Sequence, residues 1–346
     1  MSPSTTDVAL DLDHLGAWLR ARGVEVEGGL EARRVGRGHS NLTYRVTDAV
    51  GRSWVARRPP LGHLLPSAHD VVREARVMAA LAGTGVPVPG IVGTCEDDPA
   101  AGAPVVVMEH VDGLVLDTLE VVAGVPHDVR REVGLGAARA LAAVHEVDVD
   151  AVGLGDLARR TSYAERQLRR WSRQWESSRT RDLPLVDRLT GLLTAHVPEQ
   201  TRLSLVHGDF HLRNVIVDPA DGRLLAALDW ELSTLGDPLA DLGSTLAYWP
   251  EPGEDPHGMF AGSAQGGFPT RDDLVEAYAV ASGREPVGLG FWHVLGVWKV
   301  GVIAEGVLRR VQDEPANATE GEMPQADQIT GLFQHAADLA AGYGLV

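Results

Sequence analysis

The sequence predicts an α+β protein with two lobes, a small β-rich N-terminal lobe and a larger helical C-terminal lobe. In residues 42–57, apolar and polar side chains alternate on both sides of a glycine-containing turn, which is typical of a β-hairpin. Beyond residue 114, apolar side chains recur at helical spacing instead. A chain of 346 residues is long enough for two separate cores. We therefore expect an N-lobe over residues 1–109 and a C-lobe over residues 110–346.

The individual elements follow from the same periodicities. In the N-lobe we expect helices over 11–22 and 67–81 and strands over 42–46, 54–57 and 105–108. The predicted C-lobe helices span 130–145, 161–178, 185–196, 271–282, 291–310 and 326–342. Two short strands, 215–217 and 224–228, interrupt these helices and are joined by a turn with the sequence Asp-Pro-Ala-Asp-Gly. The polar stretches 251–267 and 312–325 predict surface loops.

The composition narrows the classes of function and location. A formal net charge of −17 disfavours binding to nucleic acid, which is itself a polyanion. No run of 18 or more apolar residues occurs, so we expect no membrane span. Residues 1–9 lack the basic and apolar segments of a secretory signal. Cys95 is the only cysteine, which excludes an internal disulfide and is consistent with a cytoplasmic location.

The basic residues have an unusual distribution. Lys299 is the only lysine, and the other cationic side chains are arginines. Any contact to a phosphate elsewhere in the chain therefore has to come from arginine, histidine or backbone N–H groups.

The strongest functional signal is the segment 207–214, with the sequence His-Gly-Asp-Phe-His-Leu-Arg-Asn. It lies between two apolar runs, and Asp229 comes 15 residues after Asn214, at the end of the predicted strand 224–228. Phosphoryl transfer requires a carboxylate beside the attacking hydroxyl and hard oxygen ligands for Mg²⁺. Asp209 suits the first role, and Asn214 and Asp229 suit the second. Each of the three alone could be a turn residue, but their spacing in this order of elements favours the catalytic interpretation.

This segment, with Asp229-Trp230-Glu231 after a hairpin, resembles the aminoglycoside phosphotransferase-like kinases. That family includes choline- and homoserine-type kinases and has the two-lobed protein-kinase-like fold. The resemblance extends over nearly the whole chain, and residues 37–44, 236–242 and 292–310 resemble the branch that is fused to acyl-CoA dehydrogenases. It implies transfer of the γ-phosphate of ATP, or of GTP, to a hydroxyl of a small metabolite, with Mg²⁺ as the cofactor.

Several residues near these three in the sequence either have two alternative roles or are expected to support the site. Glu231 either joins the metal site or holds its loop. We expect His207 and His211 to orient the catalytic loop by hydrogen bonding rather than to transfer protons, with contact of His211 to a phosphate as the alternative. Asp237 and Asp241 are expected to cap or brace the helix that follows them.

The N-lobe is expected to hold the nucleotide in a glycine-containing loop. Gly36 and Gly38 would let the backbone approach the phosphates closely, and Ser40 and Asn41 could donate hydrogen bonds to them. Such loops are common, so this signal is weaker than the catalytic segment.

The chain departs from the kinase pattern at one position. In kinase-like enzymes a lysine on the third strand binds the α- and β-phosphates and pairs with a helix glutamate. Arg57 takes that place here, and Glu74 is its predicted partner unless it is an ordinary solvated residue. Strand alternation directs Arg58 to the opposite face. The resemblance also implies that backbone groups of Glu109 and Val111 contact the adenine.

Clues to the acceptor are fewer. In the predicted helix 161–178, four arginines lie on one face and two tryptophans on another. These residues are Arg166, Arg169, Arg170 and Arg173, with Trp171 and Trp175. Either the basic face binds an anionic metabolite or a coenzyme A tail, or it is a solvated face of a helix whose tryptophans lie in the core. The overall acidity would instead favour a cationic acceptor.

A small-molecule kinase is therefore the main hypothesis. The alternative is a catalytically weak pseudokinase that binds nucleotide as a binding module, for which Arg57 in place of lysine is the support. A protein kinase is the third hypothesis, but no activation segment of the usual length follows Asp229. Turnover of ATP with magnesium in the presence of hydroxylated metabolites separates the first two.

Overall fold

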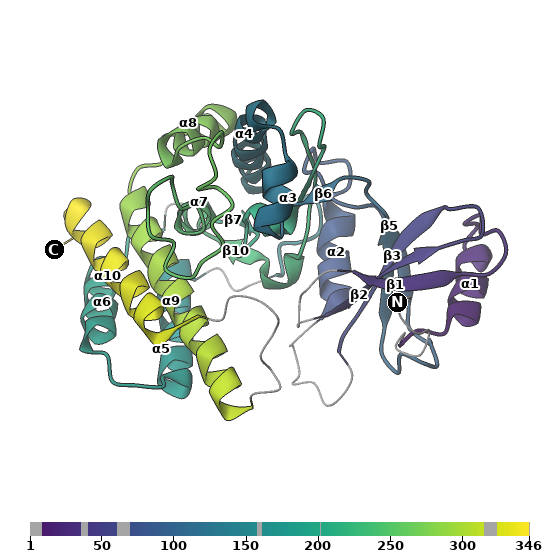
Figure 1. The fold of residues 1–346 in the computed structure, drawn as a ribbon, viewed down its shortest axis with the longest axis horizontal. Coiled ribbons are helices and arrows are strands. Elements are labelled where there is room, and N and C mark those ends of the chain that lie inside the picture. Colours follow the sequence, from purple (N-terminus) through teal and green to yellow (C-terminus); the bar gives the residue numbers. More distant parts are fainter. Residues whose placement is uncertain are drawn as a thin grey trace. The chain divides into compact units, whose positions relative to one another are not determined.

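The computed structural model describes residues 9–35, 41–60, 70–157, 161–200, 202–314 and 324–345. The chain divides into two compact units, whose elements are labelled in Figure 1. The first unit comprises Met1–Asp112 with Ala226–Glu231, and the second comprises Gly113–Leu225 with Leu232–Val346. Compared with the expected division after residue 109, the first unit runs on to Asp112 and also takes in the short segment that carries Asp229.

The first unit is built on a five-stranded antiparallel sheet with the strand order β1-β2-β3-β5-β4. The strands are β1 (Glu31–Val35), β2 (Leu42–Thr47), β3 (Ser53–Arg58), β4 (Ile91–Cys95) and β5 (Val105–Glu109). The predicted hairpin and the predicted strand at 105–108 are confirmed. Strands β1 and β4 are not among the predicted strands, because β1 carries three charged residues and β4 contains a glycine at a register shift. Neither sequence shows a clean alternation.

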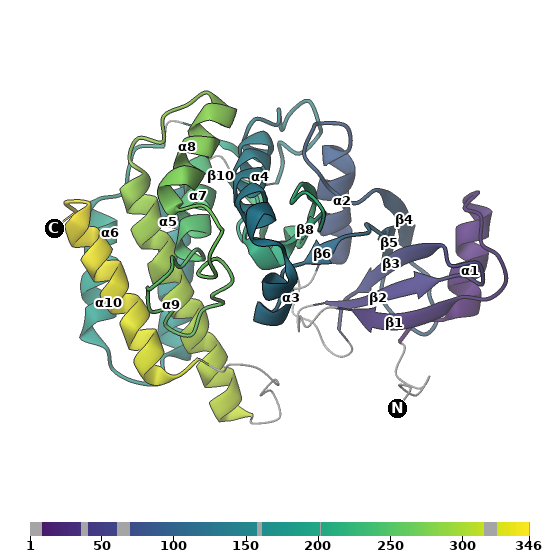
Figure 2. The ribbon, with the colours of Figure 1, turned by 45° about the horizontal axis from the view of Figure 1, so that its top comes forward.

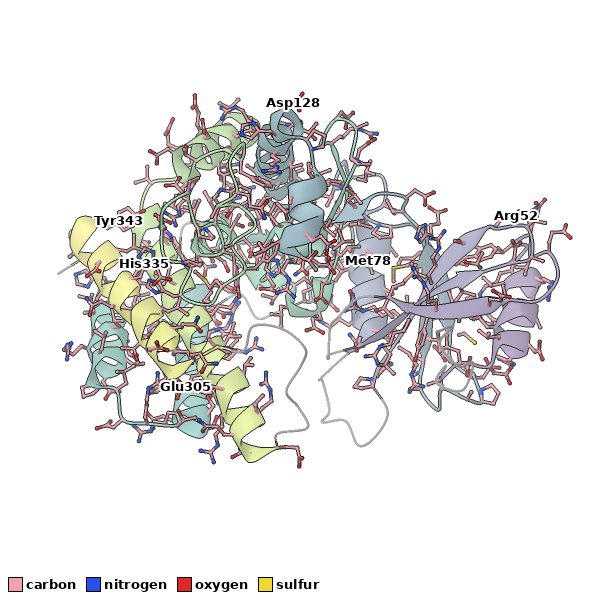
Figure 3. The ribbon with its side chains drawn as sticks, in the orientation of Figure 1. Arg52, Met78, Asp128, Glu305, His335 and Tyr343 are labelled. Carbon is pink, nitrogen blue, oxygen red and sulfur yellow. The ribbon has the colours of Figure 1, made fainter. Side chains whose placement is uncertain are left out.

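Two helices accompany this sheet, α1 (Leu12–Ala21) and α2 (Val71–Leu81). Each begins at an aspartate whose side chain accepts a hydrogen bond from a backbone N–H in the first turn, Asp11 in α1 and Asp70 in α2. Helix α1 buries Leu15 and Leu19 in a core that includes one face of β2 and β3. Helix α2 packs against β4 and β5, and its buried Met78 is labelled in Figure 3.

The second unit is mainly helical (Figures 1 and 2). Its helices are α3 (Leu119–Gly124), α4 (His127–His145), α5 (Tyr163–Ser178), α6 (Pro184–Ala195), α7 (Pro238–Ala247), α8 (Arg271–Ser282), α9 (Leu289–Asp313) and α10 (Ala326–Gly342). All six predicted helices are present, with ends that shift by a few residues. Helix α3 was not predicted, because its six residues are too few to establish a periodicity.

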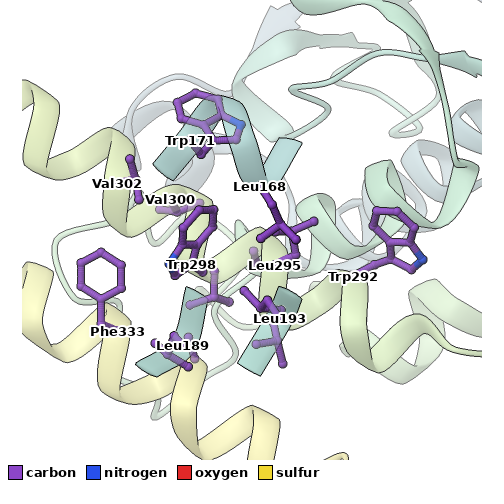
Figure 4. Close-up of a cluster of buried hydrophobic side chains, with 14 of the residues drawn as sticks. Leu168, Trp171, Leu189, Leu193, Trp292, Leu295, Trp298, Val300, Val302 and Phe333 are labelled. Atoms are coloured by element: carbon purple, nitrogen blue, oxygen red, sulfur yellow. The ribbon is translucent and has the colours of Figure 1, made fainter. Parts of the chain in front are cut away.

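Helix α9 is the centre of the second unit and packs against α5, α6, α7 and α10. Figure 4 shows the core that results, in which Trp298 of α9 lies among side chains of α5, α6 and α10. By length and composition α9 is apolar enough to cross a membrane, yet 72% of its most apolar window is buried inside the protein. A helix that is apolar on all sides is expected at the middle of a helical core.

Short strands position the catalytic segment within the second unit. Strand β7 (Ser204–Val206) pairs with β10 (Thr234–Gly236). Strands β6 (Leu114–Val115), β8 (Val215–Val217) and β9 (Leu224–Ala227) form a separate small sheet, and the chain passes into the first unit within β9. The segment 207–214 therefore starts at the end of one buried strand and ends at the start of another, which fixes both of its ends.

Candidate active-site residues in the two units

The catalytic segment folds into a loop followed by a single 3₁₀ turn, Leu212–Asn214. Asn214 Nδ2 donates to the backbone oxygen of Asp209 at 2.9 Å and so folds the turn back onto the loop. His211 Nε2 lies 3.3 Å from Asp209 Oδ2. Asp209 and Asn214 therefore lie close together, and the contacts of both histidines agree with the loop-orienting role expected of them. His207 does so by accepting a hydrogen bond from the N–H of Asp209 at 3.3 Å.

The carboxyl group of Asp209 is held in its ionised form. Burial would raise its pKa, but the opposing charges and hydrogen bond of His211, followed by the charges of Lys299 and His207, leave the pKa well below its usual range. A carboxylate that is ionised at neutral pH can orient a hydroxyl group and accept its proton.

Asp241 of α7 fixes the backbone of the catalytic loop. Its carboxylate accepts hydrogen bonds from the N–H groups of His207 at 2.5 Å and Gly208 at 2.8 Å, and His145 Nε2 lies 3.4 Å away. Asp237 caps α7 as predicted, since its side chain accepts a hydrogen bond from the N–H of Leu239. The expectation that Asp241 braces this helix was wrong. Asp241 lies one turn into the helix on its buried side, and its carboxylate braces the catalytic loop instead.

Sequence reasoning assigned no site role to Lys299, which also contacts this loop. Its Nζ donates to the backbone oxygen of Gly208 at 2.7 Å. The one available signal was that Lys299 is the only lysine in the chain. Its place beside a segment 91 residues earlier could not be read from spacing, because α9 reaches the loop only through the packing of the helices.

In the first unit, Arg57 lies between two carboxylates. Its Nε is 2.9 Å from Glu74 Oε2, and its Nη2 is 2.6 Å from Asp229 Oδ1. The predicted ion pair of Arg57 with Glu74 is confirmed, and Glu74 is buried rather than solvated. Arg58 points to the opposite face as expected, where it is fully buried and donates to the backbone oxygens of Ala9 and Pro59.

Glu74 also supports the segment that carries Asp229. Its Oε1 accepts a hydrogen bond from the N–H of Trp230 at 3.2 Å. Burial raises the pKa of Glu74 to about 7, against the lowering effect of the Arg57 charge. Asp229 itself has a φ of 64°, a left-handed conformation that non-glycine residues adopt at a cost and that is often found at functional sites.

The glycine-containing loop is only partly described. Gly36, Gly38 and Ser40 lie outside the described residues, so their predicted phosphate contacts stay predictions. Asn41 is described and buried, and its Nδ2 lies 3.4 Å from Glu231 Oε2. This contact corresponds to the loop-holding role that was one of the two alternatives for Glu231. The buried Oδ1 of Asn41 has no hydrogen-bond partner among the described residues.

The predicted adenine contacts are narrowed by the structure. The N–H of Glu109 donates to the backbone oxygen of Gly90 at 2.8 Å, so this donor is not available to a base. The N–H is taken because Glu109 is still part of strand β5, where a neighbouring segment uses this donor. The carbonyl oxygen of Glu109 and the backbone groups of Val111 stay predicted contacts to the adenine.

Asn214 and Asp229 each keep one oxygen atom without a partner among the described residues. These atoms are the amide oxygen Oδ1 of Asn214 and the carboxylate oxygen Oδ2 of Asp229, since the hydrogen bonds of the two side chains use Asn214 Nδ2 and Asp229 Oδ1. Amide and carboxylate oxygens are the ligand types that Mg²⁺ takes in proteins. Asn214 belongs to the second unit and Asp229 to the first, and each is described within its own unit.

The basic face of α5 is largely engaged in contacts within the second unit. Arg166 donates to the backbone oxygen of Leu235 at 2.6 Å, and Arg170 lies over the ring of Trp171. Both tryptophans of the helix are buried in the core, as the structural alternative predicted. Arg169 and Arg173 border an open groove between α5 and α6.

Comparison with known proteins identifies the family. The model of the phosphotransferase enzyme family matches residues 31–282, which is most of the chain. The chain belongs to this family. Acyl-CoA dehydrogenase family member 10 of Mus musculus is 34% identical to this chain over 347 aligned residues. The match covers 98% of the chain but only 31% of that relative, so the chain spans about a third of the length of the relative.

Solved structures agree with this assignment. A Ralstonia eutropha protein assigned to the aminoglycoside phosphotransferases superposes with a TM-score of 0.80 and 31% identity, covering 96% of this family member and 99% of that chain. A thermostable mutant of aminoglycoside phosphotransferase APH(4)-Ia, in a ternary complex with ADP and hygromycin B, has a TM-score of 0.60 and 15% identity over 94% and 98% of the two chains. At that identity the likeness shows the fold alone. The predicted kinase-like fold of small sheet-containing lobe and helical lobe is thereby confirmed.

Proposed function

We propose that this phosphotransferase moves the γ-phosphate of ATP to a hydroxyl group of a small metabolite. The observation that carries the proposal is the place of the Asp209 carboxylate, in a loop whose backbone is fixed by Asp241 and which Asn214 folds back onto Asp209. Such a group can orient the acceptor hydroxyl and accept its proton, which is the task of the catalytic carboxylate in phosphoryl transfer.

In the proposed reaction each bond that forms is matched by one that breaks, and the released proton has an acceptor. The acceptor oxygen forms a bond to the γ-phosphorus, the bond from the γ-phosphorus to the β–γ bridging oxygen breaks, ADP leaves, and the hydroxyl proton passes to Asp209. Asn214 and Asp229 would hold Mg²⁺, which neutralises charge on the phosphates when it is bound. Arg57 would bind the α- and β-phosphates in the role usually taken by lysine.

The acceptor class is inferred from the longer protein in which the matching segment of a relative occurs. The relative from Mus musculus carries the matching segment within a longer protein that is named an acyl-CoA dehydrogenase family member. Hydroxylated acyl-CoA thioesters are therefore the acceptors to test first, because a kinase domain in the same chain as a dehydrogenase for acyl-CoA would act on a related substrate. Hygromycin B, which accompanies ADP in a fold neighbour, represents the aminoglycosides in the panel.

The experiment is release of ADP from ATP and Mg²⁺ in the presence of each acceptor, with mass spectrometry of the product. Each hydroxyacyl-CoA is paired with the acyl-CoA of the same chain length that lacks the hydroxyl. Acceptor-dependent ADP release with a phosphorylated product, absent for the matched acyl-CoA and lost in Asp209→Asn, is expected. GTP in place of ATP defines the nucleotide preference.

The pseudokinase alternative rests on the same Arg57. In the structure its guanidinium is bound by both Glu74 and Asp229, so nucleotide binding would have to compete with Asp229 for Arg57. Nucleotide binding by calorimetry without ADP release for any acceptor would favour this alternative.

A further inference from the structure

Gly208, just before the catalytic aspartate, is held through both of the peptide units that flank it. Asp241 of α7 accepts a hydrogen bond from the N–H of Gly208, and Lys299 of α9 donates to its carbonyl oxygen at 2.7 Å. Gly208 has a φ of 86°, and a Cβ there would lie 2.7 Å from the backbone oxygen of Leu232. The position therefore requires glycine. Because glycine has more backbone conformations open to it than other residues, neighbouring side chains have to restrict its backbone here.

Lys299 has more hydrogen-bonding capacity than this contact uses. An ammonium group offers three donors, and the described residues give it one hydrogen-bond acceptor, the oxygen of Gly208. Its Nζ also lies 5.5 Å from the ring centre of Trp171. The charge is therefore held near an aromatic face. Burial lowers the pKa of Lys299, and the negative charge of Asp209 opposes that lowering.

A cavity beside Lys299 offers room for a further hydrogen-bond acceptor of its ammonium group. It has a volume of about 20 Å³, and its lining includes Gly208, Asp241, Ser244 and Lys299. A volume above roughly 10–15 Å³ admits one water molecule when polar groups line it. The hydroxyl oxygen of Ser244 is buried and has no hydrogen-bond partner among the described residues. A buried hydroxyl without a partner next to such a cavity indicates an ordered water.

We propose that Lys299 is a positioning residue of the catalytic loop, which holds the Gly208 carbonyl and shares a water molecule in the adjacent cavity with Ser244. The clamp of Lys299 and Asp241 on the two peptide units that flank Gly208 fixes the direction in which the chain enters Asp209, and so the direction of its carboxylate. The proposal rests on the proposed function, because a fixed direction matters only if Asp209 acts on an acceptor.

The first test is Lys299→Met, which removes the charge and the donors and keeps the length of the side chain. Loss of a hydrogen bond from a charged group predicts that kcat falls about 10- to 100-fold. The KM for ATP is expected to change less than about twofold, because Lys299 holds the loop that faces the acceptor. Arg309→Met, which removes an exposed basic side chain from the same helix, is the matched control and is expected to leave kcat unchanged.

Hydrogen exchange of the backbone amides gives a readout that needs no turnover. In Lys299→Met, exchange is expected to become faster in segment 207–214 while the rest of α9 and α10 keeps its protection. Unchanged exchange in this segment, or faster exchange throughout the second unit, would overturn the positioning role. If the parent transfers phosphate to no acceptor, the proposed function fails while the exchange result still decides whether the clamp exists.

The water is tested by a crystal structure of the parent and of Ser244→Ala. A density peak within hydrogen-bond distance of Lys299 Nζ and Ser244 Oγ is expected in the parent, and its loss or weakening is expected in the variant. An empty cavity in the parent would overturn the shared water, and a direct bond between the two side chains would do the same.

Discussion

Arg57 Nη2 lies 2.6 Å from Asp229 Oδ1, while its Nε lies 2.9 Å from Glu74. The arginine in the position of the usual lysine is thus shared between the helix glutamate and the aspartate proposed to hold the metal. A guanidinium has five donors in a fixed fork, so it can keep one carboxylate while it releases the other. We expect nucleotide and Mg²⁺ to displace Asp229 from Arg57 and to leave the pair with Glu74 in place.

The first prediction concerns this shared arginine. Arg57→Ala should lose a charge-assisted contact to phosphate that is worth about 1.5–3 kcal/mol, or about 10- to 150-fold in ATP affinity. Arg57→Lys should recover much of the affinity, since lysine is the usual residue in this role. Titration calorimetry with ATP and Mg²⁺ measures both.

The control for Arg57 has to be chosen from the structure. Arg58→Ala is unsuitable, because Arg58 is fully buried and bonds two backbone oxygens, so its loss should destabilise the fold. Arg33→Ala changes an exposed arginine of the same sheet and should leave ATP affinity unchanged. An affinity of Arg57→Ala equal to that of Arg33→Ala would remove Arg57 from the nucleotide site.

The second prediction separates chemistry from binding. Asp209→Asn should lower kcat by about 10²–10⁴-fold, the usual contribution of a general base. The Kd for ATP should stay close to that of the parent, because Asp209 is expected to meet the acceptor rather than the nucleotide. Rapid-quench assays and calorimetry on the same preparation provide the two values. Turnover within tenfold of the parent would exclude a central role for Asp209.

The third prediction concerns the metal. Asp229→Ala should weaken the binding of ATP in the presence of Mg²⁺ and leave its binding without Mg²⁺ nearly unchanged, because an oxygen ligand is lost. Glu25→Ala, which removes an exposed carboxylate of the same unit, is the control. If magnesium dependence survives in Asp229→Ala and is lost in Glu231→Gln, then Glu231 is the metal ligand instead.

The fourth prediction is a dependence of stability on pH. Burial, with the charges of Arg271 and His335, lowers the pKa of His293 to about 3, and its Nδ1 lies 3.1 Å from the hydroxyl of Tyr343, which is labelled in Figure 3. The unfolded chain takes up a proton near pH 6.5 and the folded chain does not, so this group's contribution is lost as pH falls from about 6.5 toward 3.

Urea unfolding from pH 7 to pH 4 measures this effect. The parent should lose up to about 1.4 kcal/mol per pH unit more than His293→Asn, which keeps a polar atom near Tyr343 and cannot take up a proton in this range. His196→Asn, at an exposed histidine, should follow the parent. Parallel curves for the parent and His293→Asn would contradict the prediction.

Much of the site could be predicted because its residues lie a short distance apart in the sequence or on successive elements. Asp209 and Asn214 are five residues apart, and a loop between two strands brings them together without help from distant segments. Arg57 and Glu74 could be paired because the sequence predicted a strand followed by a helix, and the alternation of β3 selected Arg57 over Arg58. Boundaries of short elements such as α3 could not be predicted, since six residues carry too little periodicity.

By itself, the sequence determined the order of strands and helices and the catalytic segment, because these depend on side-chain periodicity and local turn chemistry. Only the tertiary structure decided that Asp241 and Lys299, 33 and 91 residues from Gly208, hold the two peptide units that flank Gly208 from two helices. It also decided that Asp229 belongs with Arg57, 172 residues earlier in the chain. Such contacts depend on how α7 and α9 pack and on which unit a strand end joins, and no local pattern encodes either.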